Sequence, residues 1–172
     1  MLKTLSIATA VSALTIGSVA TLTQAIEPAT LIAVGAQAAP HVISGVKSVA
    51  SQIYKARSVV LEVDNRTDVP LQAVSSSHKH GGFLQLLPHG QIPPGHYSVF
   101  TSGAIGVATG TEGNVTYAGD GFNLVVYWKN PYVGSNKCWT NLSGPNAGNY
   151  QVFSPCGRGN KGAHMRYELS KR

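Results

Sequence analysis

Residues 58–68, SVVLEVDNRTD, carry the pattern that decides the fold. Apolar side chains recur at every second position from Val59 to Val63, which is the period of a β-strand. The polar run from Asp64 to Asp68 then has the composition of a turn. The stretch therefore predicts a strand that is followed by a tight polar turn.

The same short period continues toward the C-terminus, interrupted by glycine and proline. Turn residues cluster at 81–82, 93–95, 119–121 and 144–146, and such clusters separate short strands. We expect further strands near residues 69–76, 83–87, 96–101, 104–108, 112–118, 122–128, 149–153 and 163–169. About eight or nine short strands at this spacing predict a mainly β fold, a compact antiparallel β-sandwich.

The N-terminus has the features of a secretory signal. Lys3 precedes an apolar run from Leu5 to Leu22, and Thr23-Gln24-Ala25 matches a signal-peptidase site. A single membrane anchor is the alternative, but serine and threonine dilute the run and no basic cluster follows it. We expect residues 1–25 to be removed and the protein to be secreted.

Residues 26–56 differ in composition from the domain that we place at 57–172, and from residue 42 their apolar positions follow a helical period. The apolar face consists of Val42, Ile43, Val46, Val49 and Ile53. This N-terminal amphipathic helix either packs against the β domain or lies on, or enters, a bilayer.

Two further features agree with export. The chain has two cysteines, Cys138 and Cys156, and in an oxidising compartment we expect them to form a disulfide, worth about 3 kcal/mol by the loop-entropy model. Asn-x-Ser/Thr triplets at Asn65, Asn114 and Asn141 are candidate glycosylation sites.

The formal net charge of +6 favours anionic partners. The cations are scattered, and the sequence has neither an arginine-rich run nor an aromatic RNA-binding motif, so we expect no nucleic acid partner. Anionic lipid head groups or acidic glycans suit an exported protein better.

The sequence offers no recognisable catalytic apparatus. It lacks a nucleophile elbow, an H-E-x-x-H pair and paired carboxylates. The segment His78-Lys79-His80, with His89 and His96 nearby, could hold zinc or copper because alternate strand residues share a face. The intervening lysine and the lack of neighbouring cysteine or carboxylate ligands favour a solvated loop instead. We expect no enzyme activity, no metal and no cofactor.

Aromatic side chains concentrate between residues 122 and 139. A strand that ends in Tyr127-Trp128 opens into a loop with Pro131 and Tyr132, and Trp139 follows. Tyrosine and tryptophan favour sites with one apolar and one wet side, such as a membrane surface or a glycan site. The alternative is that the tryptophans belong to the core. Because alternation puts Tyr127 and Trp128 on opposite faces, we expect one of them buried and one exposed.

Several segments resemble, in their order, the aegerolysin-like and small crystal-protein toxins of fungi and bacteria. They are 58–68 (SVVLEVDNRTD), 92–95 (IPPG), 109–117 (TGTEGNVTY), 127–136 (YWKNPYVGSN) and 159–165 (GNKGAHM). The order of amphipathic helix, strand, D-N-x-T turn and later P-Y loop is also similar to that of the actinoporins.

This resemblance implies a β-sandwich that docks on specific lipids and, in some members, assembles into pores. It implies a lipid-facing loop with Trp128, Pro131, Tyr132 and Trp139, to which we add the adjacent cation Lys129, and an inserting helix at residues 41–55. Two departures concern the choice of lipid. Lys129 stands where aegerolysins commonly have an aspartate, and Gly134-Ser135-Asn136 stands where actinoporins have adjacent tryptophans.

We therefore predict a secreted, non-enzymatic, membrane-lipid-binding protein of the pore-forming cytolysin type, which self-assembles on membranes or acts with a partner protein. The alternative is a secreted soluble recognition module, either lectin-like or a host-directed effector, in which the helix caps the sandwich.

Overall fold

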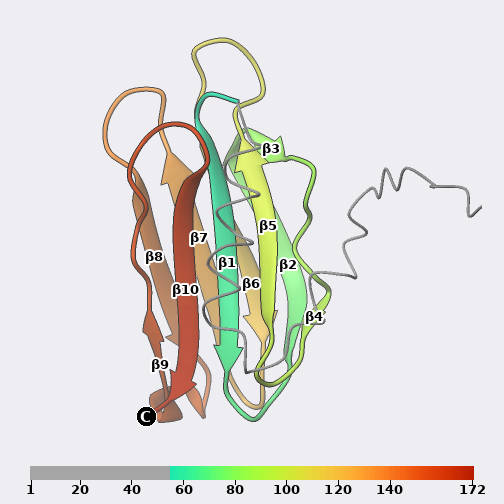
Figure 1. Ribbon diagram of the computed structural model, residues 1–172. Helices are drawn as coiled ribbons and strands as arrows, with labels where there is room; N and C mark the ends of the chain where they lie inside the picture. The colour runs from blue at the N-terminus through green and yellow to red at the C-terminus, as the bar shows by residue number, and fades with distance from the viewer. Residues whose placement is uncertain (1–54) are drawn as a thin grey trace, which may run out of the picture.

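The computed structural model describes residues 55–172, which form a two-layer β-sandwich (Figure 1). Sheet A contains β1 (Ser58–Arg66), β3 (Gly82–Phe83), β5 (Tyr97–Gly103), β9 (Tyr150–Phe153) and β10 (Ala163–Lys171). Sheet B contains β2 (Leu71–His80), β4 (Gln91–Ile92), β6 (Thr111–Ala118), β7 (Asn123–Asn130) and β8 (Lys137–Ser143). A short 3-10 turn, η2 (Ala147–Asn149), precedes β9. The predicted signal and the predicted amphipathic helix lie outside the described residues.

The prediction of a mainly β sandwich is confirmed, but the strands are not all antiparallel. The strand order is β3-β5-β1-β10-β9 in sheet A and β4-β2-β6-β7-β8 in sheet B. β1 is antiparallel to β5 but parallel to β10, in a register that runs from Val59 beside Ala163 to Arg66 beside Ser170. Parallel neighbours need a long connection, and this one includes all the strands between the first and the last.

Several strand predictions differ from the structure. The strand expected at 83–87 is limited to β3 (Gly82–Phe83), and the short β4 was not expected. Residues 104–108, expected as a strand, belong to the loop between β5 and β6, in which Gly106 and Ala108 have φ values of 107° and 56°. The left-handed backbone at these two residues is incompatible with an extended strand, although the apolar side chains of this segment alternate as they would in one. β8 was not among the expected strands, because its alternation is between half-buried and exposed side chains and is largely polar.

Trp128 fills the core near one end of the sandwich. Its side chain is fully buried, and its ring centroid lies 5.7 Å from that of Phe100 and 5.3 Å from that of His78. On the neighbouring strand β6, a Cβ at Gly113 would lie 2.7 Å from the Trp128 ring, so glycine leaves the space that the ring occupies. The prediction that Trp128 faces lipid is therefore corrected, because the side chain has no exposed surface.

Most of the long loops meet at one end of the sandwich. The β5–β6 loop (104–110), the β7–β8 loop (131–136) and the β9–β10 loop (154–162) lie together where β1 begins (Figure 1). We call this end the loop end. The antiparallel strand pairs and the single parallel pair together require this grouping, because they set the direction in which each strand enters or leaves it.

Replacing the buried tryptophan tests the packing of the core. Trp128→Ala should lower the free energy of unfolding by about 3–5 kcal/mol, since it removes a large buried ring and leaves a cavity. Trp139→Ala is the matched control; its half-exposed ring should cost at most about 1 kcal/mol. Urea unfolding of both variants measures the difference, and equal losses would contradict the burial of Trp128.

Candidate functional site

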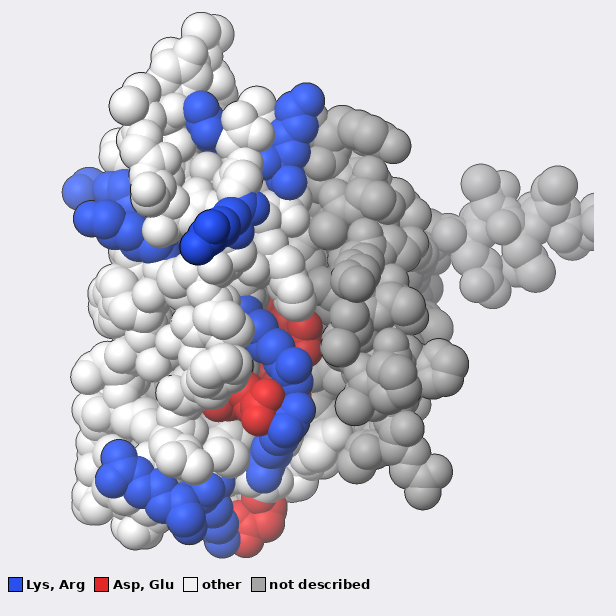
Figure 2. Space-filling model, turned by 60° about the vertical axis from the view of Figure 1, so that its left-hand side comes forward, with Lys and Arg blue, Asp and Glu red and all other residues white. Residues whose placement is uncertain are grey.

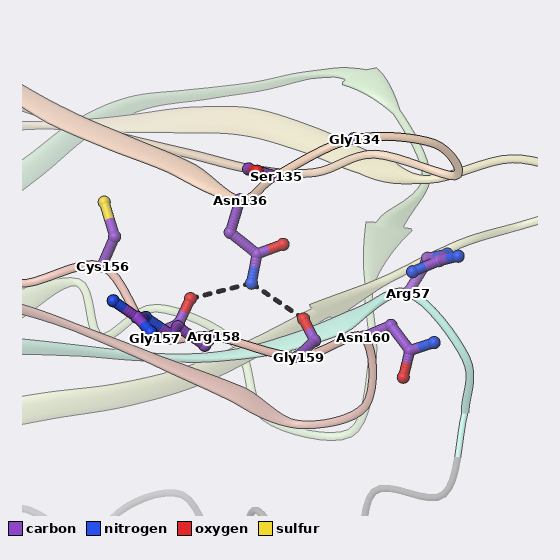
Figure 3. A pocket seen from close by; sticks show the side chains of 9 residues that line it. All are labelled: Arg57, Gly134, Ser135, Asn136, Cys156, Gly157, Arg158, Gly159 and Asn160. Carbon is purple, nitrogen blue, oxygen red and sulfur yellow. Dashed lines mark hydrogen bonds between the residues drawn. The ribbon is translucent and has the colours of Figure 1, made fainter.

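An open pocket of about 850 Å³ lies at the loop end, between the β7–β8 and β9–β10 loops (Figure 3). Its lining comes from Arg57, from residues 134–136 and from residues 156–160. The lining is mostly backbone and polar side chain, and it includes the guanidinium groups of Arg57 and Arg158. Such a pocket suits a polar or anionic group better than an apolar one.

Two cross-links hold the β9–β10 loop beside β8. The side-chain amide of Asn136 donates hydrogen bonds to the carbonyl oxygens of Gly157 and Gly159, both at 2.8 Å (Figure 3). Cys138 and Cys156 form the predicted disulfide. A Cβ at Gly157 would lie 2.0 Å from the carbonyl oxygen of His164. The loop therefore passes close to β10 and is fixed on both sides, which places Arg158 at the rim of the pocket.

Arg57 reaches the same pocket from the start of β1. The backbone N–H groups of Arg57 and Ser58 donate to the carbonyl oxygen of Asn160, and the N–H of Gly162 donates to Ser58 Oγ at 2.8 Å. The Arg57 guanidinium lies 5.4 Å from the centroid of the Tyr132 ring, within the range of a cation–π contact. Arg57 thus joins the β7–β8 loop to the β9–β10 loop.

The loop end is basic. Arg57, Lys137, Arg158 and Lys161 cluster there, and within residues 55–172 none of them forms an ion pair. Figure 2 shows Lys and Arg side chains in the upper part of the molecule without a visible Asp or Glu, and further Lys and Arg side chains lower down beside the visible acids. Bare cations around a polar pocket attract anionic groups such as phosphate.

Apolar side chains project from the same end. Val107 is 95% exposed and Val133 is 82% exposed, and Ile105 and Tyr132 are also more than half exposed. They lie on the β5–β6 and β7–β8 loops, which together line a smaller pocket of about 280 Å³. The loop end therefore presents apolar tips beside cations, an arrangement that monomeric soluble proteins use for interaction sites.

Lys129 lies on the side wall below these tips and is held by Glu112. Its Nζ is 2.8 Å from Glu112 Oε2, and the Tyr127 hydroxyl donates to Glu112 Oε1 at 2.9 Å. Burial alone would raise the pKa of Glu112, but the hydrogen bonds from Lys129 and Tyr127 outweigh it and the pKa is lowered. Burial and the bond to Glu112 raise the pKa of Tyr127 to about 12. Lys129 is thus already paired with an acid.

The structure divides the other predicted lipid-facing residues between two places. Pro131 and Tyr132 belong to the loop end, where Tyr132 is 51% exposed. Trp139 is on the outer face of sheet B, stacked on Tyr127 with 4.7 Å between ring centroids. Tyr127 is half-buried on that face while Trp128 is buried on the inner one, so the expected division between opposite faces is confirmed.

The glycosylation candidates differ in accessibility. Asn65 is fully buried, and its side-chain amide donates to the carbonyl oxygens of Val69 and Ile92 at 2.8 and 3.0 Å. The folded domain therefore cannot present Asn65 for modification, which corrects that prediction. Asn114 is half-buried and donates to Ser77 Oγ, and Asn141 is exposed.

The prediction of a solvated loop is wrong for part of the histidine cluster: His78 and His80 belong to β2, whereas His89 and His96 lie in loops. His78 lies on β2, half-buried against Phe83 and Trp128, and its Nε2 is 3.1 Å from Ser102 Oγ. Burial lowers the pKa of His78. No group of three metal-ligating side chains occurs in the part of the chain that the structure describes. In the same part, no helix has the length and apolar character needed to cross a membrane.

Sequence reasoning missed several loop-end residues. Arg57, Asn136 and Arg158 come from three separate segments and share no motif, so only the topology brings them together. Val107 was assigned to a strand. A signal was available for Val133, which directly follows the Pro131-Tyr132 pair that the sequence did single out.

No protein-family model and no curated protein matches this chain. Its structure is similar to the crystal structure of the lipid binding protein Nakanori, with a TM-score of 0.69 and 16% sequence identity over 77% of this chain and 80% of that one. At this identity the likeness establishes the sandwich fold. Membership of the aegerolysin-like family stays a prediction.

The lowered pKa of Glu112 makes part of the stability depend on pH. A carboxyl group whose folded pKa is lowered stabilises the fold above its ordinary pKa of 4.5, and that contribution is lost as the pH falls through the folded pKa. Glu112→Gln should therefore be less stable than the parent at pH 7, with a smaller loss of stability on acidification.

Urea unfolding between pH 7 and pH 3 measures this dependence. Asp68→Asn is the matched control, because Asp68 pairs with Lys171 at the exposed surface and such pairs contribute little. If the stability of Glu112→Gln fell as much on acidification as that of the parent, the stabilising role of the Glu112 carboxylate would be contradicted.

Proposed function

We propose that this protein binds membrane lipid with its loop end. The observation that carries the proposal is the juxtaposition of cations that form no ion pair within residues 55–172 with exposed apolar tips on adjoining loops. Cations bind the phosphate of a head group, while apolar tips enter the boundary between head groups and acyl chains. The description of Nakanori as lipid binding agrees with this proposal.

The magnitudes indicate that charge and apolar contact must act together. Each Lys or Arg near an anionic membrane contributes about 1 kcal/mol, so four such residues alone give a dissociation constant on the order of 1 mM. Full burial of a valine or isoleucine side chain adds about 1.5–3 kcal/mol. Val107 and Val133, the most exposed of the tips, therefore decide whether binding reaches the micromolar range.

We also propose that the protein is secreted and that its function includes no enzymatic step. A disulfide that ties the candidate site is compatible with an extracellular location. In this proposal the loop end binds and orients lipid, and neither a nucleophile nor a general base takes part. A secreted lipid-binding protein is thus the function that the site supports best.

Co-sedimentation with vesicles tests the lipid proposal. The vesicles contain phosphatidylcholine alone, with added phosphatidylserine, or with sphingomyelin and sterol. Arg158→Glu/Lys161→Glu should weaken binding at least tenfold, because it reverses two charges at the loop end. Val107→Ser/Val133→Ser should weaken it as much, and at all salt concentrations, since the lost contact is apolar.

Matched controls change the same chemistry elsewhere on the surface. Lys171→Glu/Arg172→Glu reverses two charges at the opposite end, and Val74→Ser/Leu87→Ser removes two exposed apolar side chains away from the loop end. Both controls should bind like the parent. Failure of the parent to bind any of these vesicles, or equal losses in the controls, would refute the proposal.

Pore formation after self-assembly is the finer form of the proposal. Lys55 and Arg57 lie at the loop end, so a helix that precedes them is attached next to the proposed lipid contact. We expect the mature chain to release dye from the vesicles that it binds, and a chain lacking residues 26–56 to bind without release. Dye release by the shortened chain would contradict an inserting role for that segment.

The second candidate is a soluble recognition module that does not insert. The exposed Trp139–Tyr127 stack on the outer face of sheet B favours it, because this stack is separate from the loop-end pocket. Binding to a glycan or host protein with inert vesicles would support this alternative against the first.

A further inference from the structure

The outer face of sheet B is built from rows of small polar side chains. The strand register aligns Ser75, Thr116, Val125 and Asn141 in one row, and Ser77, Asn114, Tyr127 and Trp139 in the next. A third row, nearer the opposite end, contains Gln72, Ala118, Asn123 and Ser143. These three rows contain hydroxyl and amide groups and no charged side chain.

Trp139 provides an aromatic surface on this face. Its ring stacks on that of Tyr127 with an interplanar angle of 17° and 4.7 Å between centroids, and the residue is 48% exposed. Tyr127 is itself fixed, because its hydroxyl donates to the buried Glu112. One side of the Trp139 ring is thus covered by a held partner, and the residue remains open to solvent.

The chemistry around this ring selects the class of ligand. An acyl chain would need a wider apolar surround, but on this face the ring is bordered by Asn141 and Lys137 along β8. Across the strand pair it meets Tyr127, and Val125 is its one aliphatic diagonal neighbour. A multiply charged anion would need more than one free cation. Lys129 is paired with Glu112, which leaves Lys137, two residues from Trp139 on the same strand face, as the one nearby cation without an ion pair in residues 55–172. A neutral ligand with one apolar face and many hydroxyl groups fits both conditions.

We propose that this face is a sugar-binding platform on which a neutral pyranose stacks against Trp139. The C–H face of a pyranose ring is apolar and slightly positive, and it meets the negative face of the aromatic ring. The hydroxyl groups at the ring edge then exchange hydrogen bonds with Asn141, whose side chain shares the strand face of Trp139, and with nearby Ser, Thr and Asn side chains. This site goes beyond the lipid contact, because it uses a different surface and no loop-end cation.

Saturation-transfer NMR with methyl glycosides tests the platform. The probes are methyl glycosides of glucose, galactose, mannose and N-acetylglucosamine, titrated into the millimolar range expected for one stacked ring and a few hydrogen bonds. At least one should bind saturably. Trp139→Ala should weaken that binding at least tenfold, and Trp139→Phe should retain most of it. Because Trp128 is buried, the sugar should also shift the emission of Trp139 in the parent chain.

Two controls keep the result specific. Phe153→Ala removes a 66% exposed aromatic ring from sheet A and should leave sugar binding unchanged. Arg158→Glu/Lys161→Glu should also bind sugar like the parent, so that failure of the lipid proposal and failure of this one are distinguishable. No saturable binding of any probe, or equal binding by Trp139→Ala, would overturn the platform.

The sugar can come from another molecule or from a glycan on Asn141 itself. Asn141 is exposed and lies two residues from Trp139 on the same strand face. In protein from a glycosylating host with a modified Asn141, loss of the free-sugar binding that the same chain from a non-glycosylating host shows would assign the platform to the chain's own glycan. Retained binding would assign it to sugars of another molecule.

Discussion

The parallel pairing of β1 with β10 is the constraint on which the loop end depends. Because the two strands run in the same direction, the start of β1 and the end of the β9–β10 loop must lie together. The carbonyl of Asn160 accepts hydrogen bonds from both Arg57 and Ser58 at this junction. Without this pairing Arg57 would not be held beside Tyr132, and the pocket would lose the part of its lining that Arg57 provides.

The positive charge of the loop end also depends on where the acids are held. Arg166 on β10 contacts Glu62, Asp64 and Glu168 at 3.3, 2.7 and 3.1 Å on the outer face of sheet A. Glu112 is paired with Lys129, and Asp68 with Lys171. Most acids of residues 55–172 are thus paired with a cation, whereas Arg57, Lys137, Arg158 and Lys161 are not, and these four cations define the potential of the loop end. The loop end is therefore locally positive.

The sequence predicted the individual strands better than it predicted which strands pair with each other. Alternation identified β1, β6 and β7, and the two cysteines predicted their own pairing, because these signals are local. The parallel partner of β1 was not predictable, since it lies about 100 residues further along the chain and leaves no trace in the local period. Ile105 and Val107 misled for the opposite reason: their alternation is strand-like, but positive φ at Gly106 and Ala108 turns it into a loop.

The candidate site shows the same division. The aromatic segment 127–139 drew attention to Tyr132 and Trp139, which are about half exposed, but the sequence could not separate them from the buried Trp128. The separation depends on Gly113 across the sheet, which leaves room for the Trp128 ring and so buries it. Arg57, Asn136 and Arg158 converge only because three loops meet at one end. Residues that only the topology brings together cannot be recognised as one site from the separate segments of the sequence.

The stack of Tyr127 and Trp139 lies close to the loop end, on the side of the molecule. Trp139 is the third residue of β8, so a rise of about 3.4 Å per residue places it roughly 7 Å below the point where that strand leaves the loop end. A molecule that stands upright on a bilayer would hold this aromatic shelf sideways, just above the head groups. The two proposed sites could therefore be occupied at the same time, since the loop end would face the bilayer and the Trp139 ring would face along it.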